Sequence, residues 1–185
     1  FYSTALHWQF VSVQAHAHSH YRLHNHALAS SLRRQDTQIQ LVGDGAHAEL
    51  NSAVMVAERL NLDQQITIEH IGAQTSSHQR VHNIIADRGQ STFNGRIHIH
   101  NGAKKSNAQL SNKNIGLGAS ATINTKPELE IYNDDVSCAH GATIGRLDDS
   151  QLFYLCSRGV APAAARRLLC EGFLHQCVDG PLADT

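Results

Sequence analysis

The sequence predicts a mainly β protein that ends in a short α-helical segment. Apolar and polar residues alternate in several short stretches of the first 146 residues, which is the spacing of a strand with one buried face. Clusters of Gly, Asn, Asp and Ser separate these stretches and indicate turns. After residue 146 the apolar residues take the spacing of helices. We therefore expect a β unit over residues 1–146 and an incomplete helical segment over residues 147–185.

The predicted strands follow one another at short and fairly even intervals. Their apolar starts lie near residues 39, 53, 66, 81, 97, 115 and 129, which are 13 to 18 residues apart. One helix is also expected in this region, around Ala53–Leu60. Six apolar residues are predicted to point inward, with polar neighbours pointing outward: Ile66, Ile68, Ile97, Ile99, Leu129 and Ile131.

Two architectures fit an array of many short strands. A sandwich or barrel is the usual arrangement. The other is a parallel β-helix with two strands in each coil and roughly 25–30 residues per coil. Only 5% of the residues are aromatic, and a high content of small residues suits the narrow interior of a coil. Composition favours the β-helix only slightly and leaves both architectures open.

Two helices are predicted after the β unit. Asp148 suits the N-cap of the first, with Gln151 as its capping-box partner, and Gly159 suits the position just beyond its end. The second is expected over residues 162–178, because proline is favoured in a first helical turn. One stripe of this helix carries Leu169, Phe173 and Cys177. Two helices cannot bury all their apolar faces on each other, so part of this surface should meet the β unit or another protein.

Charge and composition exclude several classes of protein. Lys and Arg number 15 and Asp and Glu number 16, for a net charge of −1, so a strongly basic nucleic-acid-binding protein is not expected. No apolar run approaches the ~20 residues of a membrane span, and no polybasic membrane patch occurs. The 4 cysteines include no C-x-x-C pair, which argues against a disulfide framework and favours the reducing cytoplasm. The chain begins at Phe1 without an initiator Met, so we expect a fragment.

Histidines form the densest group of candidate metal ligands. The chain has 14 of them, and His16, His18 and His20 would point to one face if they lay on one strand. Imidazoles at that spacing can bind Zn, Ni or Cu. No carboxylate or thiolate nearby completes a ligand shell, so the alternative is a solvated strand face. His98 and His100 form a similar pair with the same alternative.

A second candidate site lies just before the predicted helices. Cys138 and His140 would share one face of an extended strand, and a thiolate with an imidazole is a half-site for iron or zinc. The alternative is that Cys138 packs as a small apolar residue behind Val136. His140 should be more exposed, because Gly141 is expected to turn the chain toward the helices. The Gly116–Ala121 run matches G-x-G-x-x-A, but the β pattern continues after it, which excludes a dinucleotide-binding fold.

Several ordered motifs resemble one known family. They are Phe93–Ile97, Gln109–Asn114, Lys126–Val136, Cys138–Gly145, Leu152–Leu155 and Ser157–Gly159. Together they are similar to the C-terminal part of the SufB/SufD family of the SUF iron–sulfur cluster assembly system, over about residues 36–175. The His-Gly-Ala-Thr run at residues 140–143 resembles the SufD branch.

The resemblance implies a right-handed parallel β-helix core, cut short on its N-terminal side, followed by C-terminal helices. It also implies a scaffold subunit rather than an enzyme, which pairs with SufB and docks the SufC ATPase through the helices. The iron–sulfur cluster would be transient at the interface with SufB, with none bound by this chain alone. His140 matches the family histidine that contributes to this site, whereas Cys138 inherits no role.

The expected docking face for SufC combines apolar and basic side chains on the two helices. It comprises Leu152, Phe153, Arg158, Arg166, Arg167, Leu169 and Phe173. A β-helix cut open exposes strand edges, so a homodimer is another possible state. One alternative function is a β-helix enzyme of the acyltransferase or lyase type with His140 as base, for which neither paired carboxylates nor a hexapeptide repeat is present. The other is a His-rich metal-binding module.

Overall fold

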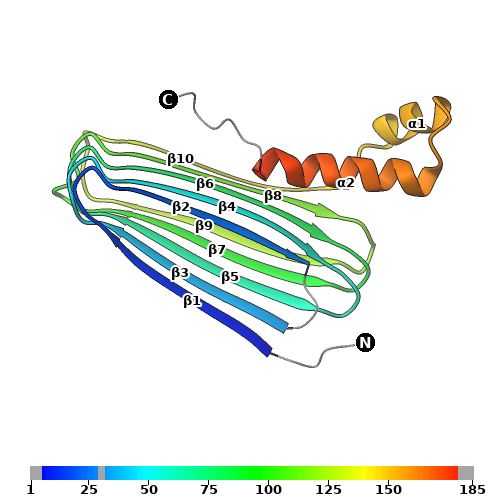
Figure 1. Ribbon diagram of the computed structural model, residues 1–185, viewed down its shortest axis with the longest axis horizontal. Coiled ribbons are helices and arrows are strands. Elements are labelled where there is room, and N and C mark those ends of the chain that lie inside the picture. Colours follow the sequence, from blue (N-terminus) through cyan, green and yellow to red (C-terminus); the bar gives the residue numbers. More distant parts are fainter. Residues whose placement is uncertain (1–5, 29–31, 179–185) are drawn as a thin grey trace.

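The computed structural model describes residues 6–28 and 32–178, which form ten strands followed by two helices (Figure 1). In chain order the strands are β1 (Leu6–Ala15), β2 (His20–Leu28), β3 (Leu32–Leu41), β4 (His47–Val56), β5 (Asn61–His70), β6 (Ser76–Ile85), β7 (Gln90–Ile99), β8 (Asn107–Gly116), β9 (Thr122–Ile131) and β10 (Ser137–Gly145). The helices are α1 (Asp149–Ser157) and α2 (Pro162–Val178).

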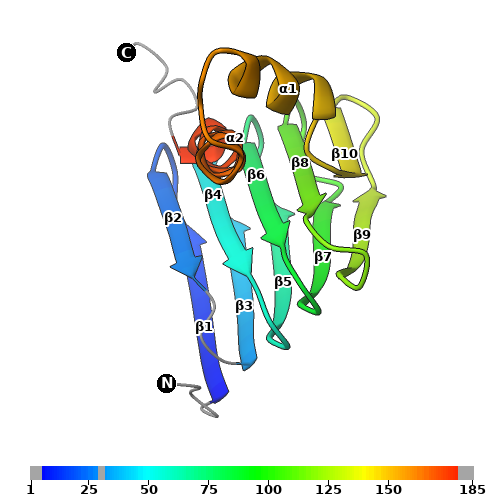
Figure 2. The same cartoon turned by 90° about the vertical axis from the view of Figure 1, so that its right-hand side faces the viewer.

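The strands wind into a parallel β-helix with two strands in each coil. Odd-numbered strands form sheet A in the order β1-β3-β5-β7-β9, and even-numbered strands form sheet B in the order β10-β8-β6-β4-β2 (Figure 2). Every described pairing is parallel. Leu6 lies opposite Leu32, a coil of 26 residues, and Gln90 lies opposite Thr122, a coil of 32 residues. The β-helix expectation is confirmed, and the sandwich or barrel is not the fold.

The turns that lead from sheet A to sheet B stack on one another along the β-helix. Three of their residues, His18, Gln74 and Lys105, have a left-handed backbone with φ of 54° to 56°. A Cβ atom on Gly72 would lie 2.6 Å from the backbone carbon of Gly43 in the turn before it. Glycine therefore allows the backbones of successive turns to approach this closely.

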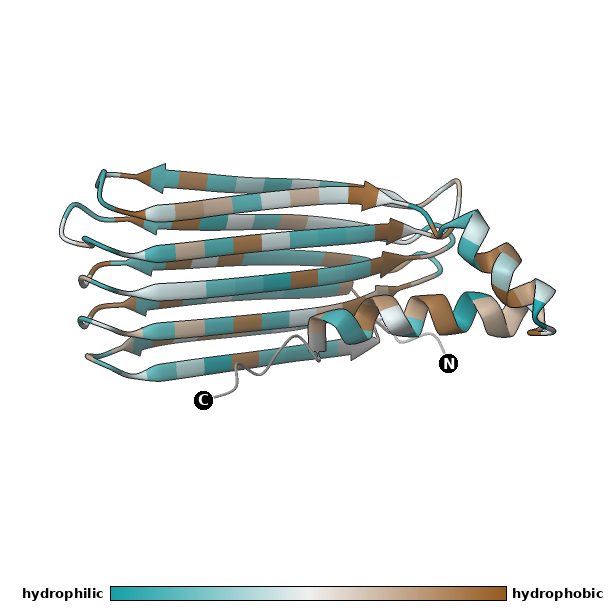
Figure 3. Cartoon of the chain, turned by 90° about the horizontal axis from the view of Figure 1, so that it is seen from above, coloured by the Kyte–Doolittle hydropathy of each residue, from teal (hydrophilic) through white to brown (hydrophobic). Residues whose placement is uncertain are grey.

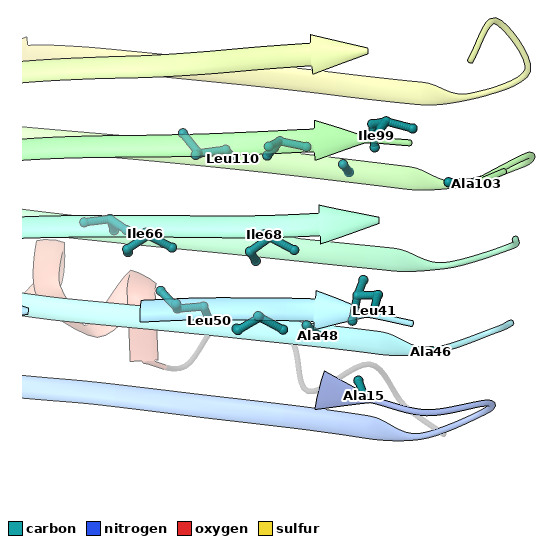
Figure 4. Packing of buried hydrophobic residues seen from close by; sticks show 14 of the residues in the cluster. Ala15, Leu41, Ala46, Ala48, Leu50, Ile66, Ile68, Ile99, Ala103 and Leu110 are labelled. Atoms are coloured by element: carbon teal, nitrogen blue, oxygen red, sulfur yellow. The ribbon is translucent and has the colours of Figure 1, made fainter. Parts of the chain in front are cut away.

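The core lies between the two sheets inside the coils (Figure 4). Ile66, Ile68 and Ile97 are buried, as is Ile99. Ile131 lies opposite Ile99 and so faces the same way, but it is 45% exposed. Because β9 is the last strand of sheet A, no further coil covers the inward positions of this strand.

Amide side chains are also buried inside the coils. Gln64 Nε2 donates to Gln35 Oε1 at 3.0 Å. Asn83 Nδ2 donates to Gln64 Oε1 at 3.1 Å and to Asn114 Oδ1 at 3.3 Å. The Gln64–Gln35 and Asn83–Asn114 bonds link successive coils, and the Asn83–Gln64 bond links the two sheets of one coil. The interior is therefore held in register by polar contacts as well as by apolar packing.

The helix expected around Ala53–Leu60 is absent, and this prediction is wrong. The segment is the end of β4 followed by a turn, in which Glu58 has φ of 61°. The sequence does not identify this strand because both of its faces are buried. Val54 and Val56 point into the coil, while Ala53 is covered on the outside. A strand buried on both faces loses the alternation that identifies it. The strands β1 and β2 also precede the first predicted strand start.

Helix α1 begins and ends at the predicted capping residues, and α2 begins at the predicted proline. A reciprocal capping-box bond from Gln151 stays a prediction. The Asp148 side chain accepts a hydrogen bond from the Ser150 amide at the start of α1. Gly159 follows α1 with φ of 89°, and Pro162 is the first residue of α2. Strand β10 ends at Gly145, close to the boundary proposed at residue 146.

Helix α2 lies on the outer face of sheet B, over β4 and β6 (Figures 1 and 2). The Cys177 thiol donates to the Ser52 carbonyl at 3.3 Å and to the Arg80 carbonyl at 3.2 Å. The His82 ring stacks on Phe173 with centroids 4.7 Å apart, and its Nδ1 donates to the Phe173 carbonyl at 2.8 Å. The β unit of the same chain therefore covers part of the apolar stripe of α2.

Figure 3 shows that hydrophilic and hydrophobic residues alternate along the strands and that both kinds occur along the helices. Within the described residues, neither helix has the length and apolar character that a bilayer crossing requires.

Candidate functional site: the last coil and the helix pair

The last coil leaves a free strand edge on each sheet. Strand β9 pairs with β7, and β10 pairs with β8, and each ends the order of its sheet in the described part of the chain. Every residue of β10 except Cys138 is exposed. A free edge carries unpaired backbone N–H and C=O groups that can pair with a strand of another molecule. The last coil therefore has two strand edges with backbone groups that a strand of another molecule could pair with.

His140 lies on this surface at an inward-facing position. It stands opposite Leu110, which is buried in the core, so both side chains face the interior of the coil. The ring of His140 is nevertheless exposed, because no coil follows β10, and it has no hydrogen-bond or ion-pair partner among the described residues. Its expected place at the strand exit is wrong, since β10 continues to Gly145 and the chain leaves the sheet there.

Cys138 shares the inward face of β10 with His140, as the spacing predicts. It lies opposite Ala108, is half-buried and packs against the core together with Val136. Burial raises the pKa of the Cys138 thiol, although a backbone hydrogen bond at Ala108 works in the opposite direction. A raised pKa disfavours the thiolate that would bind metal. The environment of Cys138 thus suits a small packing residue better than a ligand.

The early histidines do not share one strand face. His16 and His18 lie in the turn between β1 and β2, and His20 is the first residue of β2. His18 has a left-handed backbone, and its Nδ1 lies 2.7 Å from the place of a Cβ on Gly45. The histidines keep a spacing of two residues through the turn, and this spacing suggested that all three lie on a single strand. Across residues 6–28 and 32–178, no three His, Cys, Asp or Glu side chains are arranged to hold one metal ion.

The helix pair presents an apolar surface that residues 6–28 and 32–178 leave exposed. Phe153 is 75% exposed, whereas Leu152 and Leu169 are half-buried. Tyr154 and Leu168 are also exposed, and sequence reasoning missed them, although both lie next to predicted docking residues. A hollow of about 340 Å³ lies between the helices and is lined by Ser150, Gln151, Tyr154, Leu155 and Leu169.

Basic side chains border this apolar surface. The Arg158 guanidinium lies 5.3 Å from the centre of the Tyr154 ring, a cation–π distance. Arg166 is exposed, and Arg167 Nε lies 3.7 Å from Glu171 Oε1 one turn further along α2. Phe173 is the one predicted docking residue whose ring stacks on the β unit, at His82. A docking role for all seven residues stays a prediction.

Comparison with known proteins identifies the family of this chain. The family model described as "SUF system FeS cluster assembly, SufBD core domain" matches residues 2–173. The chain belongs to the SufBD core family. The match begins at residue 2, so it also includes the early histidines, which lie outside the motifs that suggested the family.

Two relatives of this chain are named SufD, and a third is named as a SufBD family protein. The iron–sulfur cluster assembly protein SufD of Escherichia coli is 38% identical over 156 residues, which cover 84% of this chain and 37% of that protein. SufD of Bacillus subtilis is 34% identical over 139 residues, which cover 75% of this chain and 32% of that protein. A SufBD family protein of Synechocystis is 36% identical over 166 residues, or 89% of this chain. The chain thus spans about a third of the length of these relatives.

Proposed function

We propose that this chain is the C-terminal part of a SufD-like scaffold subunit that pairs with SufB and docks the SufC ATPase during iron–sulfur cluster assembly. The observation that carries the proposal is the uncovered last coil, where both sheets end in a free edge. A second β-helix placed against this end would continue both sheets. Membership of the SufBD core family supports the role in cluster assembly.

The chemistry of the last coil fits strand addition by a similar partner. The backbone groups of β9 and β10 would supply hydrogen bonds, which give affinity in strand addition, and the side chains would supply specificity. Ile131 and Tyr132 on one edge and Ile144 on the other are 45%, 57% and 57% exposed. A partner coil would remove this apolar surface from water. Two copies of this chain could use the same edges, so a homodimer is the competing outcome.

His140 would then lie between the last coil of this chain and the first coil of its partner. Its inward position, opposite Leu110, directs the imidazole toward the space that the partner would close. Neutral imidazole is a good ligand for iron. The chain would contribute this histidine to a transient cluster, which is cargo rather than a resident cofactor. The remaining ligands would come from SufB, since the raised pKa of Cys138 makes it a poor thiolate donor.

The helix pair would dock the ATPase. Phe153, Tyr154 and Leu168 supply exposed apolar surface, and Leu152, Leu169 and Phe173 add their uncovered parts. Arg158, Arg166 and Arg167 would form a basic border around this area. Exposed aromatic and arginine side chains are the types that most often dominate binding at protein interfaces.

The experiment that tests SufB pairing compares two neighbouring substitutions on β10 of the full-length protein. Ile144 stands opposite Asn114 on the inward face, and Thr143 stands opposite Lys113 on the outward face; both are exposed. Ile144→Asp places a charge against the partner coil and should abolish co-elution with SufB, while Thr143→Asp should preserve it. Co-elution that survives Ile144→Asp would contradict the proposed interface.

The same assay separates the two docking surfaces. Phe153→Asp should abolish binding of the SufC ATPase and leave SufB pairing intact, whereas Ile144→Asp should do the reverse. Circular dichroism of both variants checks that the β-helix is folded. Loss of both partners in either folded variant would show that the surfaces are not independent and would contradict the assignment of one partner to each.

A further inference from the structure

A pair of histidines lies on the outer face of sheet A, away from the free edge of sheet B that carries His140. His98 is on β7 and His100 follows its end, so the two side chains project from the same face. Their ring centroids are 4.2 Å apart, with 39° between the ring planes. Tyr132 flanks the pair, with its ring centroid 5.2 Å from that of His98.

Each imidazole has a carboxylate from a neighbouring strand on one of its two nitrogens. His98 Nδ1 lies 3.0 Å from Glu130 Oε2, and His100 Nε2 lies 3.2 Å from Glu69 Oε2. Glu130 is in turn held by Arg96 Nη2 at 2.6 Å. Hydrogen bonds from Arg96, and to a smaller extent from His98, lower the pKa of the Glu130 carboxyl, so it is an ionised acceptor at neutral pH.

These contacts favour the tautomer in which each ring carries its proton on the nitrogen beside the carboxylate. Arg96 Nη2 also lies near His98 Nδ1, but at 3.4 Å it is farther away than Glu130 Oε2 at 3.0 Å. A neutral imidazole that donates to a carboxylate through one nitrogen leaves a lone pair on the other. The free nitrogens are therefore Nε2 of His98 and Nδ1 of His100. Histidines that bind metals usually donate their second ring N–H to a carboxylate, which fixes the tautomer and makes the ligating nitrogen more basic. Both rings of this pair have that arrangement.

We propose that His98 and His100 form a binding site for one divalent transition-metal ion of the group that prefers imidazole, namely Fe²⁺, Ni²⁺, Cu²⁺ or Zn²⁺. The ligands are Nε2 of His98 and Nδ1 of His100, and water fills the remaining positions. Glu130 and Glu69 orient the rings and offset the charge of the ion. With two protein ligands, the site is compatible with the absence of any three-residue cluster among the described side chains. It does not depend on the proposed scaffold function.

The chain contains a matched control for this site. His24 and His26 on β2 have the same spacing, but their ring centroids are 5.9 Å apart. Both are exposed, and neither has a carboxylate hydrogen bond among the described residues. If spacing alone made a metal site, the two pairs would bind equally. If the carboxylates matter, His98 and His100 should take the first ion.

The test titrates the metal-free full-length protein with Ni²⁺ by calorimetry and with one equivalent of Cu²⁺ by electron paramagnetic resonance. The double variant His98→Gln and His100→Gln should lower the affinity for the first Ni²⁺ by about ten-fold or more. Glu130→Gln combined with Glu69→Gln should lower it by about ten-fold, the usual effect of removing such supporting groups. His24→Gln with His26→Gln should change it less than about two-fold. The first Cu²⁺ in the wild type should show two imidazole nitrogens.

Three results with the variants, and one with the wild type, would overturn the proposal. The first is unchanged Ni²⁺ affinity in the His98 and His100 variant. The second is an equal loss in the His24 and His26 variant. The third is an unchanged affinity when both glutamates are replaced. The Cu²⁺ spectrum of the wild type needs no substitution, so a first ion without two imidazole ligands would also overturn it, whether or not a variant folds.

Discussion

The middle coils and the last coil differ in whether their inward positions are covered. Leu110 on β8 and His140 on β10 are register partners, yet Leu110 is 3% exposed and His140 is exposed. In the same way Ile99 is buried, while its partner Ile131 is 45% exposed. The difference comes from the next coil, which covers Leu110 and Ile99 and is missing above His140 and Ile131. An inward position in this fold stabilises the chain when the next coil covers it, and it is exposed to solvent or to a partner when no coil does.

The largest expected contrast is between truncations at these two register partners. Leu110→Ala should lower the free energy of unfolding by about 2–5 kcal/mol, because it leaves a cavity between closed coils. His140→Ala should change it by less than about 0.5 kcal/mol, since an exposed side chain without a partner contributes little. Urea unfolding of the full-length protein measures both.

The same pair separates stability from assembly. His140→Ala should lose cluster loading while the complex with SufB persists, whereas Leu110→Ala should weaken the complex only as far as it weakens folding. Cluster is measured by visible absorbance and bound iron, and the complex by co-elution. If His140→Ala leaves the cluster yield unchanged, or destroys folding, the ligand role is wrong.

A second prediction concerns how the stability of the closed coils depends on pH. His70 is fully buried, with Nδ1 at 2.9 Å from Thr75 Oγ1 and Nε2 at 2.8 Å from Ser77 Oγ. Burial lowers the pKa of His70 from 6.5 to about 4. Between these values the unfolded chain binds a proton that the folded chain excludes, so stability falls as pH decreases. The loss from His70 should approach about 3 kcal/mol near pH 4.

The slope of stability against pH tests this assignment. His70→Gln keeps polar atoms near the two hydroxyl groups and should remove much of the slope between pH 6.5 and 4. Leu110→Ala is the matched control, because it destabilises the same closed region without removing a titrating group. A slope that is the same in His70→Gln and in the wild type would show that other groups dominate acid unfolding.

How far the sequence predicts the molecule also differs between these regions. In the closed coils, alternation alone located the strands around Ile66 and Ile97, because one face of each is buried and the other is not. It failed at Ala53, where α2 buries the outer face as well, and at His18, where the alternation continues through a turn. Parallel pairing came from the family motifs, since period two is the same in parallel and antiparallel sheets.

The candidate site was less predictable than the fold. The shared face of Cys138 and His140 follows from their spacing, but the exposure of His140 depends on what lies beyond β10, which spacing does not encode. The pairing of His98 with Glu130, and of His100 with Glu69, joins residues 32 and 31 positions apart. Such contacts can be predicted only when the number of residues per coil is known.

A third contrast concerns a polar side chain in the closed interior. Gln79 is fully buried opposite Leu50 and Leu110, and neither Nε2 nor Oε1 has a hydrogen-bond partner among the described residues. Burying unpaired polar groups is costly. Gln79→Met, which has a similar shape and no such groups, should raise the free energy of unfolding by about 1–3 kcal/mol. A decrease would mean that buried water or an unseen partner satisfies Gln79.

The last contrast concerns two glycines, one in a strand of a closed coil and one in a strand of the last coil. A Cβ on Gly95 in β7 would lie 2.5 Å from Phe93 Cζ and 2.6 Å from Leu110 Cδ1, whereas a Cβ on Gly141 in β10 would meet nothing within 4 Å. Gly95→Ala should therefore destabilise the chain by about 1–3 kcal/mol through overpacking. Gly141→Ala should stabilise the isolated chain by about 0.5–1 kcal/mol, because glycine weakens a strand.

The two alanine variants also test what covers the last coil. Gly141 shares the outward face of β10 with Thr143, so the added methyl group at residue 141 should stabilise the free chain and leave pairing with SufB intact. Gly95→Ala should lower stability and leave the affinity of the folded fraction for SufB unchanged. Weaker SufB pairing in Gly141→Ala would contradict the assignment of the partner to the inward positions of β10. Equal effects of both substitutions on the free energy of unfolding would show that β7 and β10 lie in the same environment.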